Sequence, residues 1–131
     1  MADAPAARPL SPHLQIWRWT AAMAASITHR GTGLALYGGA ILLAAWFLAA
    51  ALGPETYAPV AAVVGSLFGR IVLFLFAWSL IFHTLNGLRH LYWDSGRGLS
   101  PKTAAMTAWA TYIASLVLTL IIVVAANGAA S

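Results

Sequence analysis

The 131-residue sequence contains no cysteine, and this absence excludes several kinds of chemistry. The chain can form no disulfide, no thiolate metal site and no iron–sulfur cluster of its own. It also lacks the C-x-x-C-H pattern through which haem is attached covalently. Any redox group that this chain binds must therefore be held non-covalently.

Charged residues are scarce as well. Asp, Glu, Lys and Arg make up 8% of the chain, whereas 61% of the residues are hydrophobic and the mean hydropathy is +0.81. Soluble domains carry roughly 25% charged residues. A soluble protein of this size could not bury so much apolar surface, so the sequence predicts an all-α membrane protein. The net charge of +4 rests on few residues and reflects membrane topology rather than a nucleic-acid partner.

Three stretches are apolar enough to cross a bilayer, which takes roughly 20 residues per helix. They cover about residues 31–52, 66–91 and 104–126, and the second lies within an apolar run that already begins near Val60. Before them, residues 1–25 are expected to form a cytoplasmic interfacial segment with Trp17 and Trp19 at headgroup depth. Residues 26–131 are expected to form a three-helix transmembrane domain.

Glycine and proline separate the spans. Gly53-Pro54-Glu55 is expected to end the first, and Ala58-Pro59 precedes the second. Ser100-Pro101 is typical of an N-cap followed by proline at the first helical position, and Ser11-Pro12 gives the same signal near the N-terminus.

Positively charged residues set the orientation. Arginines precede the first span, and basic residues lie at or in the second connection, whereas the first connection offers only Arg70 and the C-terminal tail offers none. The N-terminus and the second connection are therefore expected in the cytoplasm, and the C-terminus in the periplasm. The N-terminus resembles no signal or transit peptide, and direct insertion into a bacterial inner membrane fits best. The basic residues are Arg8, Arg18 and Arg30, and Arg89, Arg97 and Lys102.

Two histidines, His83 and His90, interrupt the second apolar stretch. They are almost two helical turns apart, so both imidazoles face nearly the same way, about 10 Å apart along the axis. Ionisable side chains are rare in lipid-spanning helices and by default mark function. Ser79, Gly87 and Asp94 share this stripe, which must therefore face protein, a cofactor or water.

A second cluster lies where the first span begins. Ser26, His29 and Arg30 share one helix face with Gly33 and Tyr37. With the predicted topology, this cluster and His90 both lie near the cytoplasmic boundary, and His83 lies about 10 Å deeper.

A haem is one group that these residues could hold. Its two axial imidazoles must lie at one depth, and we expect no second ligand in this chain at the depth of His83. A haem bound to His83 would therefore take its other axial histidine from another chain, and would be of b type. Its propionates would meet His29, Arg30 and His90, because arginine pairs bidentately with carboxylates. Ser26 could instead hydrogen-bond a quinone carbonyl.

Simpler interpretations of the same residues stay open. His83 could form a hydrogen bond between helices, and His90 could reach toward the headgroups or cap the helix end. Arg30 could simply hold the cytoplasmic end of its helix at the membrane surface, as the positive-inside rule describes. Arg89 is expected to point away from His83 and to pair with Asp94 or a lipid phosphate. The third span has no ionisable residue and is expected to be scaffold.

Three blocks of the sequence resemble the large cytochrome b membrane-anchor subunit of succinate dehydrogenase, respiratory complex II. They are R-P-L-S-P-H-L-Q at residues 8–15, S-I-T-H-R-G-T-G at 26–33, and H-T-L-N-G-L-R-H-L-Y-W-D at 83–94. The blocks occur in the right order among three spans, so the resemblance covers essentially the whole chain.

This resemblance implies an electron-transport subunit of a succinate:quinone oxidoreductase. A flavoprotein subunit would oxidise succinate and an iron–sulfur subunit would relay the electrons. This chain and a second small membrane-anchor subunit would bind haem b and ubiquinone, and this chain alone would not oxidise succinate. The resemblance implies His83 as the axial iron ligand, Ser26 and Arg30 at the quinone site, and His29, Arg30 and His90 beside the propionates. The second anchor would supply the other axial histidine, and the first block would contact the iron–sulfur subunit.

Three alternatives remain at this point. The chain could be the anchor of a fumarate reductase, which runs the reaction backward. One haem could lie between His29 and His90 of this same chain. The chain could also be a redox-inactive scaffold or transporter subunit, in which the histidines pack or relay protons.

Overall fold

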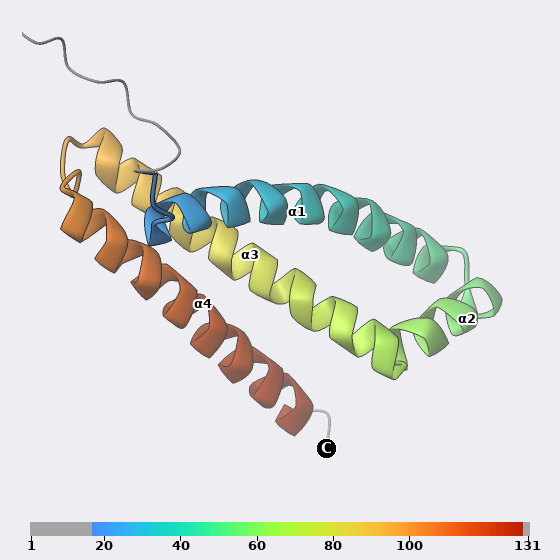
Figure 1. The fold of residues 1–131 in the computed structure, drawn as a ribbon. Helices are drawn as coiled ribbons and strands as arrows, with labels where there is room; N and C mark the ends of the chain where they lie inside the picture. The colour runs from blue at the N-terminus through green and yellow to red at the C-terminus, as the bar shows by residue number, and fades with distance from the viewer. Residues whose placement is uncertain (1–16, 130–131) are drawn as a thin grey trace, which may run out of the picture.

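The computed structural model describes residues 17–129, which form four α-helices. They are α1 (Ala21–Ala51), α2 (Pro54–Gly65), α3 (Leu67–Asp94) and α4 (Pro101–Ala129). By length and composition, α1, α3 and α4 can each cross a membrane. α3 runs through the middle, with α1 on one side and α4 on the other, and α2 joins the far ends of α1 and α3 (Figure 1). The predicted all-α fold with three membrane-spanning helices is confirmed.

α1 begins at Ala21, before the apolar run from about residue 31. Thr20 has an extended conformation, and its hydroxyl accepts a hydrogen bond from the Met23 amide at 3.2 Å, which caps the first turn. Trp17 and Trp19 precede the helix and are about half exposed, with their rings in edge contact. The rest of the expected interfacial segment, including Arg8 and Ser11-Pro12, lies outside the described residues.

The short helix α2 was not predicted. Gly53 adopts φ 108°, a left-handed conformation that favours glycine, and so ends α1. Pro54 then occupies the first turn of α2, where its missing amide leaves no intrahelical bond unmade. Pro59, which looked like a break before the second span, lies inside α2.

The apolar run from Val60 to Leu91 is divided at Ser66. This residue is extended, and its hydroxyl accepts from the Gly69 amide at 3.1 Å and donates to the Val63 carbonyl at 2.6 Å. It therefore caps α3 and turns the chain out of α2. Ser100 likewise caps α4, because its hydroxyl accepts from the Thr103 amide at 3.3 Å, and Pro101 is the first helical residue as predicted.

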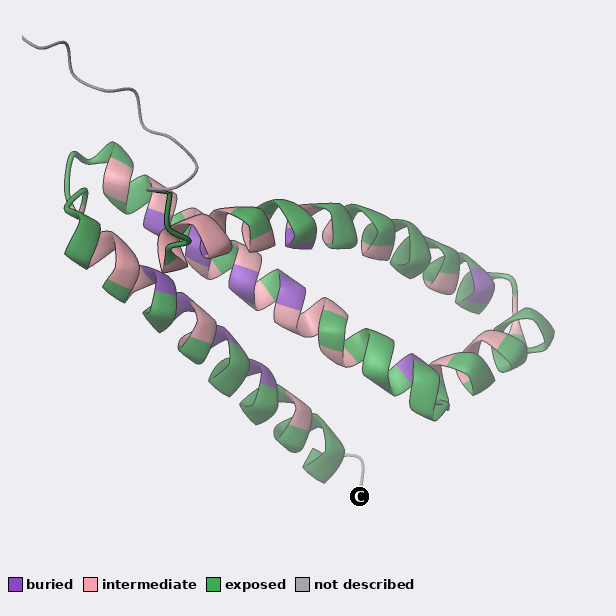
Figure 2. Cartoon of the chain, viewed as in Figure 1, coloured by how far each residue is buried: buried purple, intermediate pink, exposed green. Residues whose placement is uncertain are grey.

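Burial is concentrated where α1, α3 and α4 converge. Ala25, Phe82 and Ala108 are completely buried there, and Tyr112 packs against them. Figure 2 shows buried residues around this point and along the facing sides of α3 and α4, whereas α2 has none. Elsewhere the helices present large apolar side chains outward, with Leu67 76% exposed. Such surfaces suit lipid or neighbouring membrane helices.

The buried side of α4 is polar but satisfied. Thr111, Ser115 and Thr119 are each at most 7% exposed, and each hydroxyl donates to a backbone carbonyl of the preceding turn. Small residues whose hydroxyls are bonded in this way allow two membrane helices to approach closely. This supports the expectation that the third span is scaffold.

Arg89 fastens α3 to α4. Its Nε donates to the Thr107 hydroxyl at 2.9 Å and its Nη2 to the Ala104 carbonyl at 2.7 Å, both on α4. Nη1 donates to the Asn86 amide oxygen at 3.3 Å, and the guanidinium lies 4.0 Å from the centre of the Trp93 ring. Within residues 17–129, all three guanidinium nitrogens therefore have partners.

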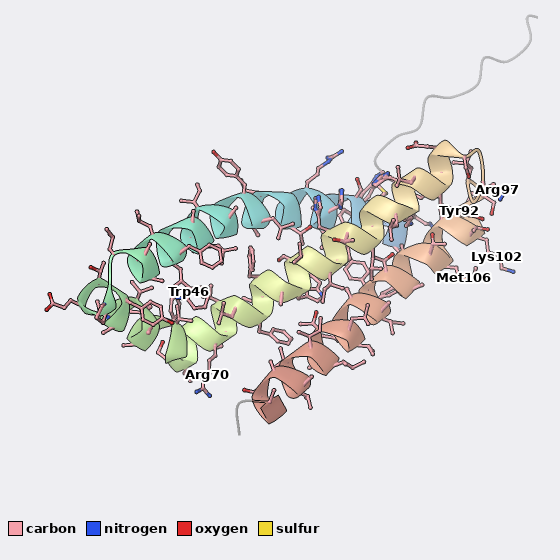
Figure 3. All side chains as sticks on the ribbon, turned by 180° about the vertical axis from the view of Figure 1, so that it is seen from behind. Trp46, Arg70, Tyr92, Arg97, Lys102 and Met106 are labelled. Atoms are coloured by element: carbon pink, nitrogen blue, oxygen red, sulfur yellow. The ribbon has the colours of Figure 1, made fainter. Side chains whose placement is uncertain are left out.

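The expected pairing of Arg89 with Asp94 or lipid phosphate is wrong. Arg89 is only 6% exposed and turns inward, because the first turns of α4 offer a hydroxyl and a carbonyl at the reach of its planar fork. Three other basic residues that the structure describes lie at the ends of the bundle, as expected for a membrane protein. Figure 3 shows Arg97 and Lys102 at one end and Arg70 at the other.

Replacing Arg89 by Leu should destabilise the α3–α4 pair by about 1–3 kcal/mol, because it leaves buried acceptors without donors. Thermal unfolding of the purified protein in detergent, followed by circular dichroism, measures this effect. Arg97→Leu is the matched control, since Arg97 is exposed in the α3–α4 connection. Equal unfolding temperatures for the two variants would contradict the assignment.

Candidate functional site

Three histidine rings meet where α1 crosses α3. The ring of His29 on α1 stacks on that of His83 on α3, with centres 3.8 Å apart and planes at 12°. The same ring lies 5.4 Å from that of His90, so His29 lies against both histidines of α3. The structure thus brings together the two clusters that the predicted topology assigned to one end of the protein.

The expected difference in depth between His29 and His83 is wrong, because their rings are in direct contact. The sequence fixes where each residue lies along its own helix, but not how far one helix slides past another. His29 therefore does offer an imidazole at the level of His83.

The stacked geometry nevertheless prevents these two rings from binding opposite faces of one haem. An imidazole binds a metal through a nitrogen at the edge of its ring and not through its face. Two rings stacked face to face at 3.8 Å leave no space for a porphyrin. As stacked here, His29 and His83 therefore do not supply two ligands to one metal ion.

The Nδ1 atom of His83 is held by α1. It lies 3.1 Å from the backbone carbonyl oxygen of His29 and 3.3 Å from the hydroxyl of Thr32. The Thr32 hydroxyl itself donates to the same carbonyl at 2.9 Å. A carbonyl only accepts and the hydroxyl proton is already used, so Nδ1 must carry the proton of the His83 ring.

This tautomer leaves the Nε2 lone pair of His83 available. Within residues 17–129, Nε2 has no hydrogen-bond partner, and a side chain at Gly87, one turn further along α3, would meet no atom within 4 Å. A histidine bonded through Nδ1 to a carbonyl, with Nε2 free of a hydrogen bond, has the arrangement typical of a metal ligand.

Gly33 allows the ring of His83 to lie this close to α1. A Cβ at Gly33 would come within 3.0 Å of the Cε1 atom of His83. Gly31, two residues earlier, faces open space, where an added Cβ would meet nothing within 4 Å. Gly33 therefore permits the close packing of α1 against α3, whereas Gly31 takes no part in it.

Two buried polar atoms in this region have no hydrogen-bond partner among the described residues. They are Nδ1 of His29 and the amide nitrogen of Asn86. Asn86 is completely buried, and its amide oxygen accepts a hydrogen bond from Arg89. Buried polar atoms are nearly always bonded, so both atoms are suited to a partner outside residues 17–129.

Ser26 and Arg30 lie on the same turn of α1, beside the histidines. Ser26 is half-buried and Arg30 is exposed, and neither has a hydrogen bond or ion pair with residues 17–129. Other helical hydroxyls, such as those of Thr84 and Thr111, donate to the carbonyl four residues earlier. The Ser26 hydroxyl and the Arg30 guanidinium are therefore available to a ligand at this end of the bundle.

Away from the histidines, α1, α2 and α3 enclose an apolar cavity of about 590 Å³. Its lining includes Leu42, Trp46 and Phe76, and Figure 3 shows Trp46 directed from α1 toward α2 and the start of α3. None of the predicted site residues lines this cavity. This apolar cavity and the candidate site therefore lie in different parts of the molecule.

Sequence reasoning missed Thr32 and Asn86 as members of the site. Thr32 lies three residues after His29, and its buried hydroxyl touches His83 across the helix interface. The available signal was its position inside the S-I-T-H-R-G-T-G block, one turn from His29, but a threonine in a membrane helix usually bonds only its own backbone.

The fold and the site together define a class: an all-helical, multi-pass membrane subunit with a histidine cluster near one end. The chain belongs to the family of succinate dehydrogenase/fumarate reductase transmembrane subunits, whose model matches residues 5–122.

Individual relatives in this family are similar over most of the chain. The succinate dehydrogenase cytochrome b556 subunit of Paracoccus denitrificans is 42% identical over 87% of this chain and 88% of its own length. That of Rickettsia bellii is 37% identical over 88% of this chain and 90% of its own length. The mitochondrial cytochrome b560 subunit of Mus musculus is 40% identical over 87% of this chain, which spans 66% of the mouse protein.

Replacing Gly33 by Val should destabilise the protein by about 1–3 kcal/mol, because the new side chain overpacks against His83. Gly31→Val is the matched control, since it makes the same change on the open side of the same helix. Thermal unfolding in detergent distinguishes the two. If Gly33→Val unfolds no earlier than Gly31→Val, the close approach of His83 to α1 is refuted.

Proposed function

We propose that this chain is the membrane-anchoring, haem b- and ubiquinone-binding subunit of succinate dehydrogenase, which passes electrons from the iron–sulfur subunit to ubiquinone. One observation carries the proposal: His83 is bonded through Nδ1 to α1 and keeps Nε2 without a partner in the described residues. Family membership, and the names of the relatives as succinate dehydrogenase cytochrome b subunits, support the same conclusion.

The donor set around His83 fits a haem. Haem b, when bound, supplies one-electron redox chemistry. The Nε2 atom of His83 would ligate the iron, and Gly87, one turn further along α3, has open space at its Cβ position. The buried Nδ1 of His29, which has no partner in residues 17–129, Arg30 and His90 would hydrogen-bond and neutralise the propionates at the cytoplasmic end.

The second axial ligand would come from the other membrane-anchor subunit. The ring of His29 stacks on that of His83 at 3.8 Å and lies 5.4 Å from that of His90, so these three histidines pack against one another. This packing favours a ligand from the other subunit over a haem held between two histidines of this chain.

Ser26 and Arg30 would form this chain's part of the quinone site. Reduction of ubiquinone to the quinol takes two electrons and two protons, and negative charge develops on the quinone oxygens as electrons arrive. The Ser26 hydroxyl would donate a hydrogen bond to one carbonyl oxygen, and the Arg30 guanidinium would stabilise the developing charge by preorganised electrostatics. Asp94, exposed at the end of α3, is suited to pass protons from the cytoplasm.

The proposed site lies at the end of the bundle that we assign to the cytoplasm. Arg97 and Lys102 lie in or beside the α3–α4 connection, which the positive-inside rule assigns to the cytoplasmic side of a bacterial inner membrane. The iron–sulfur subunit and, beyond it, the flavoprotein subunit would dock on this face. The C-terminus of α4 would then be periplasmic.

A fumarate reductase anchor is the second member of the same family. The relatives described above are all named succinate dehydrogenase subunits, which favours succinate oxidation as the physiological direction. Comparing ubiquinone with menaquinone as the partner of the purified complex distinguishes the two.

The proposal is tested by purifying the tagged chain from native membranes and recording visible difference spectra after adding succinate. A reduced b-type haem signal that malonate abolishes is expected. The signal should be lost in His83→Ala, which removes the ligand, and retained in His90→Ala. Absence of haem from the wild-type complex would instead favour a scaffold or transporter subunit, and loss with His90→Ala alone would favour a haem at the boundary.

Replacing Arg30 by Leu should lower succinate:ubiquinone reductase activity by about 10²–10³-fold, the loss typical of removing one preorganised electrostatic group. Succinate oxidation with a soluble acceptor should stay intact, because that reaction takes place on the partner subunits. Arg18→Leu, which removes an arginine before α1, is the control. Unchanged quinone reduction in Arg30→Leu would exclude Arg30 from the site.

A further inference from the structure

We infer that Thr32 is a positioning residue for His83, and that its hydroxyl adjusts how strongly the imidazole donates electrons to the haem iron. The inference rests on the proposed function, since it concerns the haem ligand. Thr32 is on α1, is only 4% exposed, and reaches His83 on α3 through its hydroxyl. It does not itself touch the iron or the quinone in this scheme.

Three atoms form a closed set of contacts at the Nδ1 edge of His83. The Thr32 hydroxyl donates to the His29 carbonyl at 2.9 Å, and Nδ1 of His83 lies 3.1 Å from that carbonyl and 3.3 Å from the hydroxyl oxygen. The proton on Nδ1 is therefore shared between two oxygens. Such outer partners of a ligating histidine fix its tautomer and raise its basicity.

The remaining contacts fix the plane of the ring. His29 stacks on one face of His83 at 3.8 Å, and Gly33 leaves room for the Cε1 corner. The face, the Nδ1 edge and this corner are therefore all set by the single turn of α1 from His29 to Gly33. Within residues 17–129, Thr32 contributes the one side-chain hydroxyl that bonds to His83.

Thr32→Val keeps the shape of the side chain but replaces the hydroxyl by a methyl group. The Nδ1 proton then has the His29 carbonyl as its only acceptor, and less electron density reaches Nε2. A weaker donor stabilises the oxidised iron less, so the midpoint potential of the haem should rise. We expect a change of up to about tenfold in the ratio of reduced to oxidised haem at a given potential, equivalent to about 59 mV for one electron.

The test is a redox titration of the haem in the purified native complex, with haem content per complex measured in parallel. Thr32→Val should raise the midpoint potential and weaken haem retention about 10–100-fold, the usual cost of losing an outer-shell partner. Thr32→Ser, which restores the hydroxyl, should titrate like the wild type. Thr28→Val is the matched control, because Thr28 lies one turn earlier on α1 and bonds to the Tyr112 hydroxyl at 2.7 Å instead.

The possible outcomes separate this inference from the proposed function. If Thr32→Val titrates and retains haem like Thr32→Ser and Thr28→Val, the role of the hydroxyl is overturned while haem binding stands. If Thr28→Val shifts the potential as far as Thr32→Val, the effect is general loosening of α1 and the inference is also overturned. A wild-type complex without haem b would overturn the proposed function and this inference together.

Discussion

The site depends on one contact between helices: the Nδ1–H of His83 on α3 donates to the backbone carbonyl of His29 on α1. This bond sets the level of α1 against α3 and thereby stacks His29 on His83. It also commits one ring nitrogen to protein and leaves the other without a hydrogen-bond partner in residues 17–129. The positions of Arg30 and Ser26 follow from this bond, because both residues lie within one turn of the His29 carbonyl on α1. A change in the sliding of α1 would move all of these groups together.

The membrane makes this contact more informative than it would be in a soluble protein. A polar group in hydrocarbon must find a partner, and many groups in α3 and α4 do so within the chain. Arg89 bonds to three residues, and the hydroxyls of Thr111, Ser115 and Thr119 bond to the backbone of α4. Within residues 17–129, the polar groups without partners include Ser26, Arg30 and Nδ1 of His29. They lie beside the histidine cluster rather than at the apolar cavity near Trp46.

The fold could largely be predicted from the sequence, and the arrangement within the site could not. Hydropathy gave the three long helices, and Ser100-Pro101 gave the start of α4, because both signals are local. The expected start of the second span near residue 66 agrees with the start of α3 at Leu67, but α2 was missed because the apolar run that begins near Val60 continues into α3. The contact of His29 with His83, the inward turn of Arg89 and the role of Thr32 depend on how helices slide and rotate against one another. No residue pattern along a single helix specifies that relation.

The most direct test of the central claim is an electron cryomicroscopy structure of the native complex purified through this chain. We predict that Nε2 of His83 ligates the haem iron, that Nδ1 of the same ring faces the His29 carbonyl, and that the opposite axial histidine belongs to another chain. A haem whose iron is bound by His29 or His90 of this chain, or a His83 ring turned so that Nδ1 faces the iron, would contradict the account.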